Sequence, residues 1–394
     1  MRVIVCGAGI AGLTAAVALT RTGHEVRVLE ARDDTAAGAA ISLWPNALAA
    51  LDEIGAGDAV RACGGRVDGG LLRLRDGTRL RRPPADALIA ALGEPLVVVE
   101  RALLRDVLTG MLPRGTVRYR TRVTSVTPTA SVSAVKSVAA VNAVTADRRR
   151  AVVHTDDGAE ADADLVIAAD GTHSTLARRL DPGLTDRYSG YTAWRAIADL
   201  EIDPGLAGEI IGDRRQVGVV PLPGGRTYWF ATQRLPEATD VGDDLAHVAD
   251  LVEHWPRPIG DAVAATTPGT LIRTDLYDRA IARRWSDGAL VVIGDAAHPM
   301  RPHLGQGGCQ AIEDAVVLAR ALRDVRDPER AAREYERVRR RRVTAVVRES
   351  RMIGRFIGAR PARAAETAMR ASLLVPDGVA LRHLAGIAGR GARS

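Results

Sequence analysis

Lysine is almost absent from this chain of 394 residues: Lys136 is the only one, and arginine carries nearly all the positive charge. A mechanism that needs a catalytic lysine is therefore excluded, unless Lys136 itself serves. Aromatic residues make up only 3% of the chain, and cysteine occurs three times, at Cys6, Cys63 and Cys309. These cysteines have no metal-ligand spacing and cannot all pair, so we expect reduced thiols, no metal site and a cytoplasmic location.

Long apolar runs are missing as well, because no stretch reaches the roughly 18 uncharged residues that a transmembrane helix needs. Hydrophobic residues at 46% and charged residues at 26% instead describe a globular enzyme of two or three structural units. The net charge of +6 is modest, the charges are intermixed, and no nucleic-acid motif is present. An anionic cofactor or small substrate is therefore a better partner than nucleic acid or a membrane.

A glycine-rich turn opens the chain. Residues 3–5 form a short β-branched run, and Gly7, Gly9 and Gly12 follow as Gly-x-Gly-x-x-Gly before a helix that extends to about residue 19. Between a strand and a helix, this spacing predicts a dinucleotide site. Gly7 allows the tight turn, Gly9 lets the backbone approach a pyrophosphate, and Gly12 lets helix and strand pack closely.

A second strand, residues 25–29, ends at Glu30, where an acid can bind a ribose hydroxyl. Arg32 follows and either touches the adenosine or is surface charge. Arg101 stands at another strand-to-helix junction, where arginine clamps a phosphate about as often as it is a surface residue. The strand at residues 164–169 opens on Asp170-Gly171, which places a carboxylate near a cofactor or is simply a good turn.

The stretch around which the chain is organised lies near residue 300. A buried-strand pattern at residues 289–293 leads into a glycine-rich segment, residues 294–308, and then into apolar residues at helical spacing, 309–322. Strand, turn and helix start present free backbone N–H groups to one spot, which favours an anion or a polar ring edge. A fold that opens its site at residue 3 and closes it near residue 300 favours FAD over NAD.

The pattern changes between residues 187 and 230 to short alternating runs with hairpin turns, which predicts a second, sheet-based unit. Aromatic residues on a sheet more often belong to a core than to a pocket. Their concentration in this unit nevertheless favours a pocket for a planar substrate. They are Tyr188, Tyr191, Trp194, Tyr228, Trp229 and Phe230.

These patterns predict an α/β chain with a Rossmann-like FAD-binding domain formed by residues 1–75, 97–183 and 281–325. A β-sheet substrate domain, residues 76–96 and 184–280, is inserted into it, and a helical region, 326–394, follows. In that region the arginine run at residues 339–342 is expected to face solvent. The Ala/Ser/Val-rich residues 129–144 fit either a hairpin excursion or a mobile loop, and they receive no chemical role.

Three motifs together resemble those of the flavin-dependent aromatic monooxygenases of the para-hydroxybenzoate hydroxylase type. They are the Gly7–Gly12 turn, Asp170-Gly171, and Gly294-Asp295 with its extension through Gly308. The likeness runs from residue 1 to about 350. Within that family the chain is most similar to bacterial urate hydroxylase and 3-hydroxybenzoate 6-hydroxylase, through residues 39–46 and 305–309.

The resemblance implies a tightly but non-covalently bound FAD, reduced by NADH or NADPH that docks transiently. It implies that the reduced flavin traps O2 as a C4a-hydroperoxide, which hydroxylates an aromatic or polyketide-like ring. By matching motif, Asp295 should bind the ribityl chain, Glu30 the adenosine ribose, Arg101 the phosphates or ribityl, and Asp170 the pyrophosphate side. The residues expected to line the isoalloxazine are Pro302, Gly305, Gly307 and Gly308.

His303 and Tyr228 are the candidate catalytic residues, with Pro302 beside them. His303 precedes the glycine turn, so we expect it to face the flavin and to deprotonate a phenol with a pKa near neutrality. Tyr228 could complete a hydrogen-bonded pair over the substrate. In the alternative, His303 caps the following helix and Tyr228 packs in the sheet.

Two departures bear on the substrate. Urate-type enzymes have an acid where this chain has His303, and residues 212–217 do not clearly keep their substrate arginine. These departures argue against urate and make a phenolic or polyketide-like ring from specialised metabolism at least as good a substrate.

Other activities remain open on the same scaffold. An epoxidase or a dehydrogenase is the alternative, and a non-enzymatic flavin-binding regulator is a further one. A flavin-dependent halogenase is disfavoured, because no two of the five tryptophans stand two apart and the only lysine lies in residues 129–144. The sequence allows a monomer or a homodimer, and either NADH or NADPH.

Overall fold

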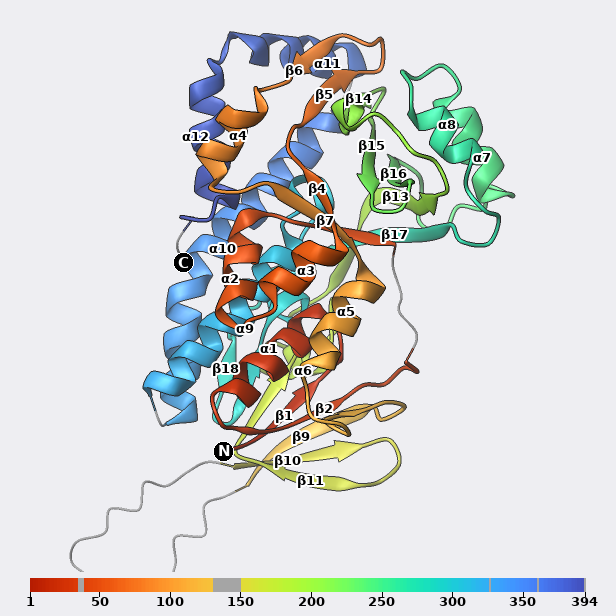
Figure 1. The fold of residues 1–394 in the computed structure, drawn as a ribbon. Coiled ribbons are helices and arrows are strands. Elements are labelled where there is room, and N and C mark those ends of the chain that lie inside the picture. The colour runs from red at the N-terminus through yellow and green to blue at the C-terminus, as the bar shows by residue number, and fades with distance from the viewer. Residues whose placement is uncertain (35–38, 130–149, 326, 360, 393–394) are drawn as a thin grey trace, which may run out of the picture.

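The computed structural model describes residues 1–34, 39–129, 150–325, 327–359 and 361–392. The segment 129–144, for which the sequence left a hairpin and a loop open, lies outside the described residues except for Thr129. A six-stranded sheet forms the lower half of the molecule in Figure 1, in the order β18-β19-β12-β1-β2-β8. All but one of its strands run parallel: β1 (Arg2–Cys6), β2 (Glu25–Leu29), β8 (Val117–Arg118), β12 (Leu165–Ala168) and β19 (Leu290–Val292). The edge strand β18 (Ser286–Asp287) is antiparallel.

The central strands of this sheet are covered on both faces. Val3, Ile4, Val5 and Cys6 of β1 are all buried, although successive side chains of a strand point to opposite faces. Helix α1 (Ile10–Arg21) packs on the sheet, and α9 (Gly307–Asp324) packs on α1. A three-stranded antiparallel sheet also contacts β1 and β12 of the six-stranded sheet. It is formed by β9 (Val123–Thr129), β10 (Arg150–Thr155) and β11 (Glu160–Ala163). Continuous apolar runs such as residues 3–5 are therefore strands with no solvent face.

A seven-stranded sheet forms the second layer, in the order β17-β13-β16-β15-β14-β5-β6. One of its faces buries Trp194 and Trp229 against α7 (Asp244–Val252) and α8 (Ile259–Ala264). Its other face, with Tyr228, packs against a small sheet of β3 (Ala40–Leu43), β7 (Leu96–Glu100) and β4 (Gly65–Val67). Its strands are β5 (Leu71–Leu74), β6 (Arg79–Arg81), β13 (Asp186–Ala198), β14 (Gly208–Gly212), β15 (Arg215–Leu222), β16 (Arg226–Gln233) and β17 (Ile272–Arg279).

The prediction of a Rossmann-like α/β fold with an inserted sheet and a C-terminal helical region is confirmed. The expected boundary at residue 75 falls just after β5, which belongs to the second sheet. The exact division of the chain into domains stays a prediction. The remaining described helices between the strands are α2 (Pro45–Glu53), α3 (Gly57–Cys63), α4 (Ala85–Leu92), α5 (Arg101–Gly110) and α6 (Thr175–Leu180).

The long helix α10 (Pro328–Ile357) runs beside both sheets (Figure 1). Tyr335 and Val343 join the core of the FAD-binding half, whereas Ile357 packs with Leu74 of the second sheet. The helices α11 (Ala362–Ala371) and α12 (Asp377–Ala388) follow. No helix in the described ranges is both long enough and apolar enough to cross a membrane.

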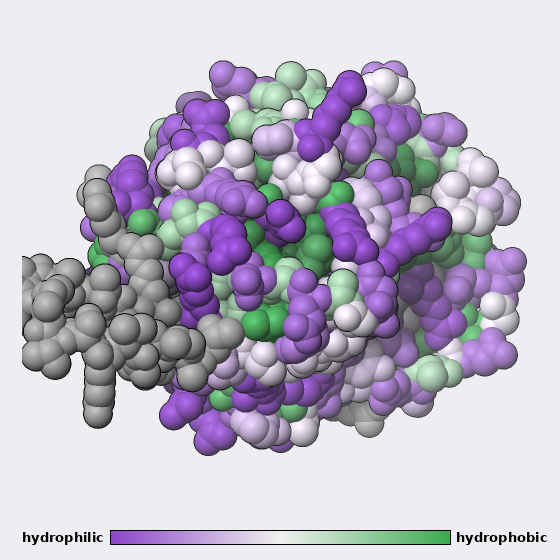
Figure 2. All heavy atoms as spheres, turned by 90° about the horizontal axis from the view of Figure 1, so that it is seen from below, coloured by the Kyte–Doolittle hydropathy of each residue, from purple (hydrophilic) through white to green (hydrophobic). Residues whose placement is uncertain are grey.

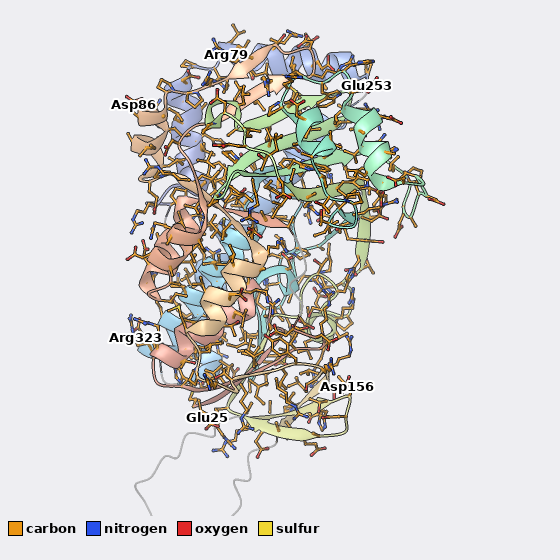
Figure 3. All side chains as sticks on the ribbon, turned by 45° about the vertical axis from the view of Figure 1, so that its right-hand side comes forward. Glu25, Arg79, Asp86, Asp156, Glu253 and Arg323 are labelled. Atoms are coloured by element: carbon orange, nitrogen blue, oxygen red, sulfur yellow. The ribbon has the colours of Figure 1, made fainter. Side chains whose placement is uncertain are left out.

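The expectation of a solvated arginine run is wrong for Arg339, which is completely buried in α10. Elsewhere, charged side chains spread over the surface: Figure 3 shows Glu25 and Asp156 at one end of the molecule and Arg79 and Glu253 at the other. Seen from below, charged and apolar residues intermix (Figure 2).

Candidate active site

The parallel strands bring the three sequence motifs to one edge of the six-stranded sheet. The turn at Gly7 follows β1, Asp170 follows β12, and Gly294 follows β19, and carboxyl ends of parallel strands share an edge. A Cβ on Gly7 would lie 2.5 Å from the carbonyl oxygen of Ala169. A Cβ on Gly294 would lie 3.1 Å from the Cβ of Ala11 in α1. The motifs are thus in direct contact.

The three glycines of the first turn each meet a different steric demand. Gly7 has φ +109°, and a Cβ on Gly12 would lie 2.0 Å from the carbonyl oxygen of Gly7. A Cβ on Gly9 would meet nothing within 4 Å. Because Gly9, the residue that precedes α1, has no side chain to cap the helix, the first N–H groups of α1 remain available next to this open space. The arrangement fits a pyrophosphate.

Glu30 is held beside the same turn by two backbone donors. Its carboxylate accepts hydrogen bonds from the N–H of Ala8 at 2.7 Å and of Arg32 at 2.9 Å. This position fits contact with a ribose hydroxyl, as expected. The side chain of Arg32 is exposed, so the structure leaves its role open between surface charge and adenosine contact.

Polar atoms without protein partners gather behind the turns, among the described residues. They include Asp170 Oδ1 and the Nε and Nη1 atoms of Arg279. Burial raises the pKa of Asp170 and lowers the pKa of Arg279. The remaining nitrogen of Arg279 donates to the carbonyl oxygens of Asp295, at 3.0 Å, and Ala296. Buried polar atoms are normally satisfied, so this edge of the sheet fits a polar ligand.

Asp295 and Arg101 face a region that solvent reaches. Both side chains are exposed, yet the surrounding protein limits hydration and raises the pKa of the Asp295 carboxyl. His298, Arg101 and Arg279 oppose that rise by their charge. An acceptor and a guanidinium on one side of the glycine turns fit ribityl hydroxyls and phosphate oxygens, respectively.

The segment after Pro302 forms a second uncapped helix start. Gly305 adopts φ +60°, and α9 begins at Gly307 without a side-chain cap. Pro302 and Gly305 are exposed, and a Cβ on Gly308 would lie 2.3 Å from the Ile41 side chain. Free N–H groups at an exposed turn fit the polar edge of a ring.

A buried ion cluster supports the Gly294–Ala296 turn from behind. Asp314 of α9 accepts hydrogen bonds from the Gly294 N–H at 2.9 Å, from His298 Nε2 and from Arg339 Nε at 2.8 Å. Burial alone would raise the pKa of Asp314, but the charges of His298 and Arg339 hold it at about 2. The cluster thus ties the turn to α9 and α10. Sequence reasoning missed it, because its members lie far apart in the chain.

His303 lies between the glycine turn and α10. Its Nδ1 donates to Gln216 Oε1 at 2.9 Å, and its ring packs edge-on against Tyr191. A Cβ on Gly354 of α10 would lie 2.4 Å from His303 Nε2. Burial, with the nearby charge of Arg301, lowers the pKa of His303 to about 4. This value lies below the near-neutral pKa expected from the sequence, so the neutral imidazole is favoured at pH 7, and the catalytic role of His303 stays a prediction.

Tyr228 and His303 have separate partners in this structure. Burial raises the pKa of Tyr228, while Arg195 beside its hydroxyl and Arg101 lower it. Gln216, the partner of His303, donates to Glu209 at 2.7 Å. Sequence reasoning did not identify Arg195, Glu209 or Gln216. An arginine inside the apolar run 193–198 was the available signal.

Comparison with known proteins gives consistent matches over most of the chain. A family model described as "FAD binding domain" matches residues 1–350. Aurachin C monooxygenase/isomerase of Stigmatella aurantiaca is 34% identical over 360 residues, which cover 90% of this chain and 89% of that protein. FAD-dependent urate hydroxylase of Klebsiella pneumoniae subsp. pneumoniae is 36% identical over 363 residues, 89% of each chain.

Two further matches add a third activity and a solved structure. The 3-amino-4-hydroxybenzoate 2-monooxygenase of Streptomyces cremeus is 34% identical over 364 residues, 90% of this chain and 86% of that protein. The crystal structure of Klebsiella pneumoniae HpxO complexed with FAD and uric acid matches with a TM-score of 0.86 and 30% identity. That match covers 98% of this chain and 96% of HpxO.

Proposed function

The chain belongs to the family of FAD-dependent aromatic monooxygenases of the para-hydroxybenzoate hydroxylase type, and from that membership we propose that it hydroxylates an aromatic or polyketide-like ring with O2 and NADH or NADPH. It is a flavin monooxygenase, and its cofactor is FAD. The observation that carries the proposal is the contact of the Gly7, Asp170 and Gly294 turns at one sheet edge, together with a second sheet whose Tyr228 face packs against the FAD-binding half.

The residues at that edge fit non-covalent FAD. We assign the pyrophosphate to the turn of Gly7, Gly9 and Gly12 with Asp170 beside it, and a ribose to Glu30. Asp295 and Arg101 would hold the ribityl chain and phosphates, with Arg32 near the adenosine. When bound, FAD supplies electron transfer and the activation of O2. The residues that would border its ring are Pro302, Gly305, Gly307 and Gly308.

The chain's own side chains orient the substrate in this proposal. Tyr228, with Arg195 beside it, would contact the ring, and Pro302 would shape the approach to it. The low pKa and the Gln216 contact of His303 favour a role in positioning Gln216 over proton abstraction. His303→Gln can keep that contact, whereas His303→Ala cannot. If His303 acts as general base, both variants lose roughly 10²–10⁴-fold in hydroxylation at full FAD content. If it positions Gln216, His303→Gln retains most of the rate.

The substrate is proposed from the site and from the relatives together. The relatives are named for urate, 3-amino-4-hydroxybenzoate and aurachin C, so related chains act on different compounds. His303 and the segment 212–217, which does not clearly keep the substrate arginine, separate this chain from the urate pattern, so we propose a phenolic or polyketide-like ring of specialised metabolism. We place the reaction in the cytoplasm, in a monomer or homodimer.

The deciding experiment measures whether an oxygen atom from O2 enters the product. The purified FAD-loaded protein is screened with ring compounds for stimulated NADH and NADPH oxidation, and active compounds are converted under labelled O2. A hydroxylated product that carries one labelled oxygen is expected. A labelled epoxide would indicate an epoxidase, and an unlabelled, dehydrogenated product would indicate a dehydrogenase. Either result would overturn the proposed hydroxylation.

A further inference from the structure

A row of residues crosses the face of the seven-stranded sheet that carries Tyr228, which we call the inner face. Arg195 of β13 lies opposite Phe230 of β16, Phe230 lies opposite Gly218 of β15, and Gly218 lies opposite Glu209 of β14. Residues directly opposite each other in a sheet share a face, and Phe230 packs with the inner cluster around Tyr228. The row therefore has a cation at one end, an acid at the other and an aromatic ring between them.

The middle of the row is flat, and its aromatic ring is only partly buried. A Cβ on Gly218 would lie 2.2 Å from the Phe230 ring, so this ring lies over a position that has no side chain. Solvent partly reaches Phe230 and both charged ends of the row, whereas Trp194 and Trp229 on the opposite face are fully buried. A planar compound could therefore lie along the row. Three strand spacings separate its ends by about 14 Å at the backbone, enough for one or two rings between the side chains.

Arg195 lacks a counter-ion. Among the described residues no carboxylate forms an ion pair with it, and the groups that act on it are the Tyr228 hydroxyl and a second cation, Arg101. Burial lowers the pKa of Arg195. A poorly hydrated cation that faces another cation is costly unless an anion pairs with it. Arg195 comes from the sheet assigned to the substrate, so an anionic group of the ring substrate fits this position.

Glu209, at the other end, is an acceptor. Its Oε2 accepts a hydrogen bond from Gln216 Nε2 at 2.7 Å, and no group among the described residues donates to its Oε1. Gln216 itself is held by His303. The position of the Glu209 carboxyl is thus set by two side chains outside the row, and one oxygen remains for a ligand.

We propose that this row selects a planar ring with an ionised oxygen at one end, bound by Arg195 and Tyr228, and a hydrogen-bond donor at the other, bound by Glu209. The proposal rests on the proposed function, because it names the substrate class of the same site. Arg195 and Glu209 then determine specificity.

The test measures probe binding by perturbation of the flavin absorbance in the FAD-loaded protein. The probes are 3-amino-4-hydroxybenzoate, its carboxamide, and 4-hydroxybenzoate, which lacks the amine. Arg195→Gln should weaken binding of the first probe about 10- to 100-fold, because a hydrogen bond between charged groups is lost. The carboxamide should change little if the carboxylate is bound. If the phenolate is bound, Arg195→Gln should weaken the binding of both 3-amino-4-hydroxybenzoate and its carboxamide. This loss of affinity should then appear at pH values above the pKa of the phenol.

Two more variants complete the test. Glu209→Leu should reduce the preference for 3-amino-4-hydroxybenzoate over 4-hydroxybenzoate. Arg273→Gln is the matched control. Arg273 lies on β17 of the same sheet, but its side chain packs on Trp194 on the opposite face. It should leave all three affinities unchanged.

Three outcomes would overturn the proposal: no flavin perturbation by either acid in the parent protein, equal affinities in Arg195→Gln and the parent, or lost FAD in Arg195→Gln with unchanged probe selectivity. The proposed function fails separately, if no oxygen from O2 enters a product although the probes bind as expected.

Discussion

At the scale of single residues, burial decides which protonation state His303 can adopt. Its pKa is about 4 in the folded protein, against about 6.5 in an unfolded chain. Between these values the unfolded state binds a proton that the folded state does not, so stability falls as pH falls through this window. We expect the parent protein to lose about 2 kcal/mol from this residue between pH 7 and pH 5.

Urea unfolding at the two pH values measures the effect of His303. His303→Gln keeps a polar partner for Gln216 but does not titrate. Between pH 7 and pH 5 this variant should therefore lose about 2 kcal/mol less free energy of unfolding than the parent protein. Equal pH dependence in the two proteins would show that the imidazole is not held neutral. Above pH 7 the comparison should show no difference in slope, because His303 is then neutral in both states.

Asp295 is the residue whose loss should affect the cofactor most directly. Asp295→Ala should weaken FAD binding about 10- to 100-fold, because hydrogen bonds between a carboxylate and the ligand are lost. Asp295→Asn should be intermediate. Flavin fluorescence during titration of the apoprotein measures the affinity. Asp287→Ala is the control, because this exposed acid lies on β18, opposite Leu290 at the start of β19. A normal affinity in Asp295→Ala would remove Asp295 from the site.

At the scale of elements, two glycines of the turn between β1 and α1 have different roles, one in packing and one in ligand binding. A Cβ at position 12 would collide with the Gly7 carbonyl, whereas a Cβ at position 9 meets open space. Gly12→Ala should therefore cost about 1–3 kcal/mol of stability even in the apoprotein. Gly9→Ala should leave apoprotein stability nearly unchanged but weaken FAD about 10- to 100-fold. Thermal unfolding of the apoproteins and FAD titration distinguish the two. Similar effects from both variants would contradict the assignment.

Arg339 is a fully buried cation at the contact between α9 and α10. Arg339 pairs with Asp314 and Glu313, and all three lie in the interior. Arg339→Met should cost about 3–5 kcal/mol, because two buried carboxylates each lose a charged partner, although Arg342 still pairs with Glu313 and His298 with Asp314. Arg337→Met in the same helix is the control, since Arg337 is exposed and its pair with Glu334 is solvated. Chemical denaturation of both variants provides the comparison, and equal stability would show that the cluster does not hold the helices together.

At the scale of the whole molecule, the second sheet packs over the FAD-binding half, and α10 spans the two. The chain contains one complete Gly-x-Gly-x-x-Gly turn after a strand, so NADH or NADPH has no dinucleotide fold of its own. We expect its oxidation to be slow without the ring substrate and faster with it, because access to the flavin depends on a conformational step. Stopped-flow reduction measures both rates, and equal rates would contradict the expectation.

The dinucleotide turn could be predicted from the sequence because each of its requirements is local. Gly7, Gly9 and Gly12 act within one strand, turn and helix, and Glu30 ends the next strand, so consecutive residues determine the geometry. The glycine-rich segment after β19 is local in the same sense. That this segment lies in the same site as the Gly7–Gly12 turn could also be predicted, because the carboxyl ends of parallel strands share one edge of a sheet.

Partners and burial were decided by the tertiary structure. The row of Arg195, Phe230, Gly218 and Glu209 exists because four strands pair in one register, and a shift by one residue would turn each side chain to the other face. Arg339 was expected in solvent because its helix face is rich in charge, but α9 brings two acids to it. The pKa of His303 depends on α10 packing beside it, roughly fifty residues later in the chain. Backbone turns are set by neighbouring residues, whereas the hydration and charge around a side chain depend on which distant segments pack against it.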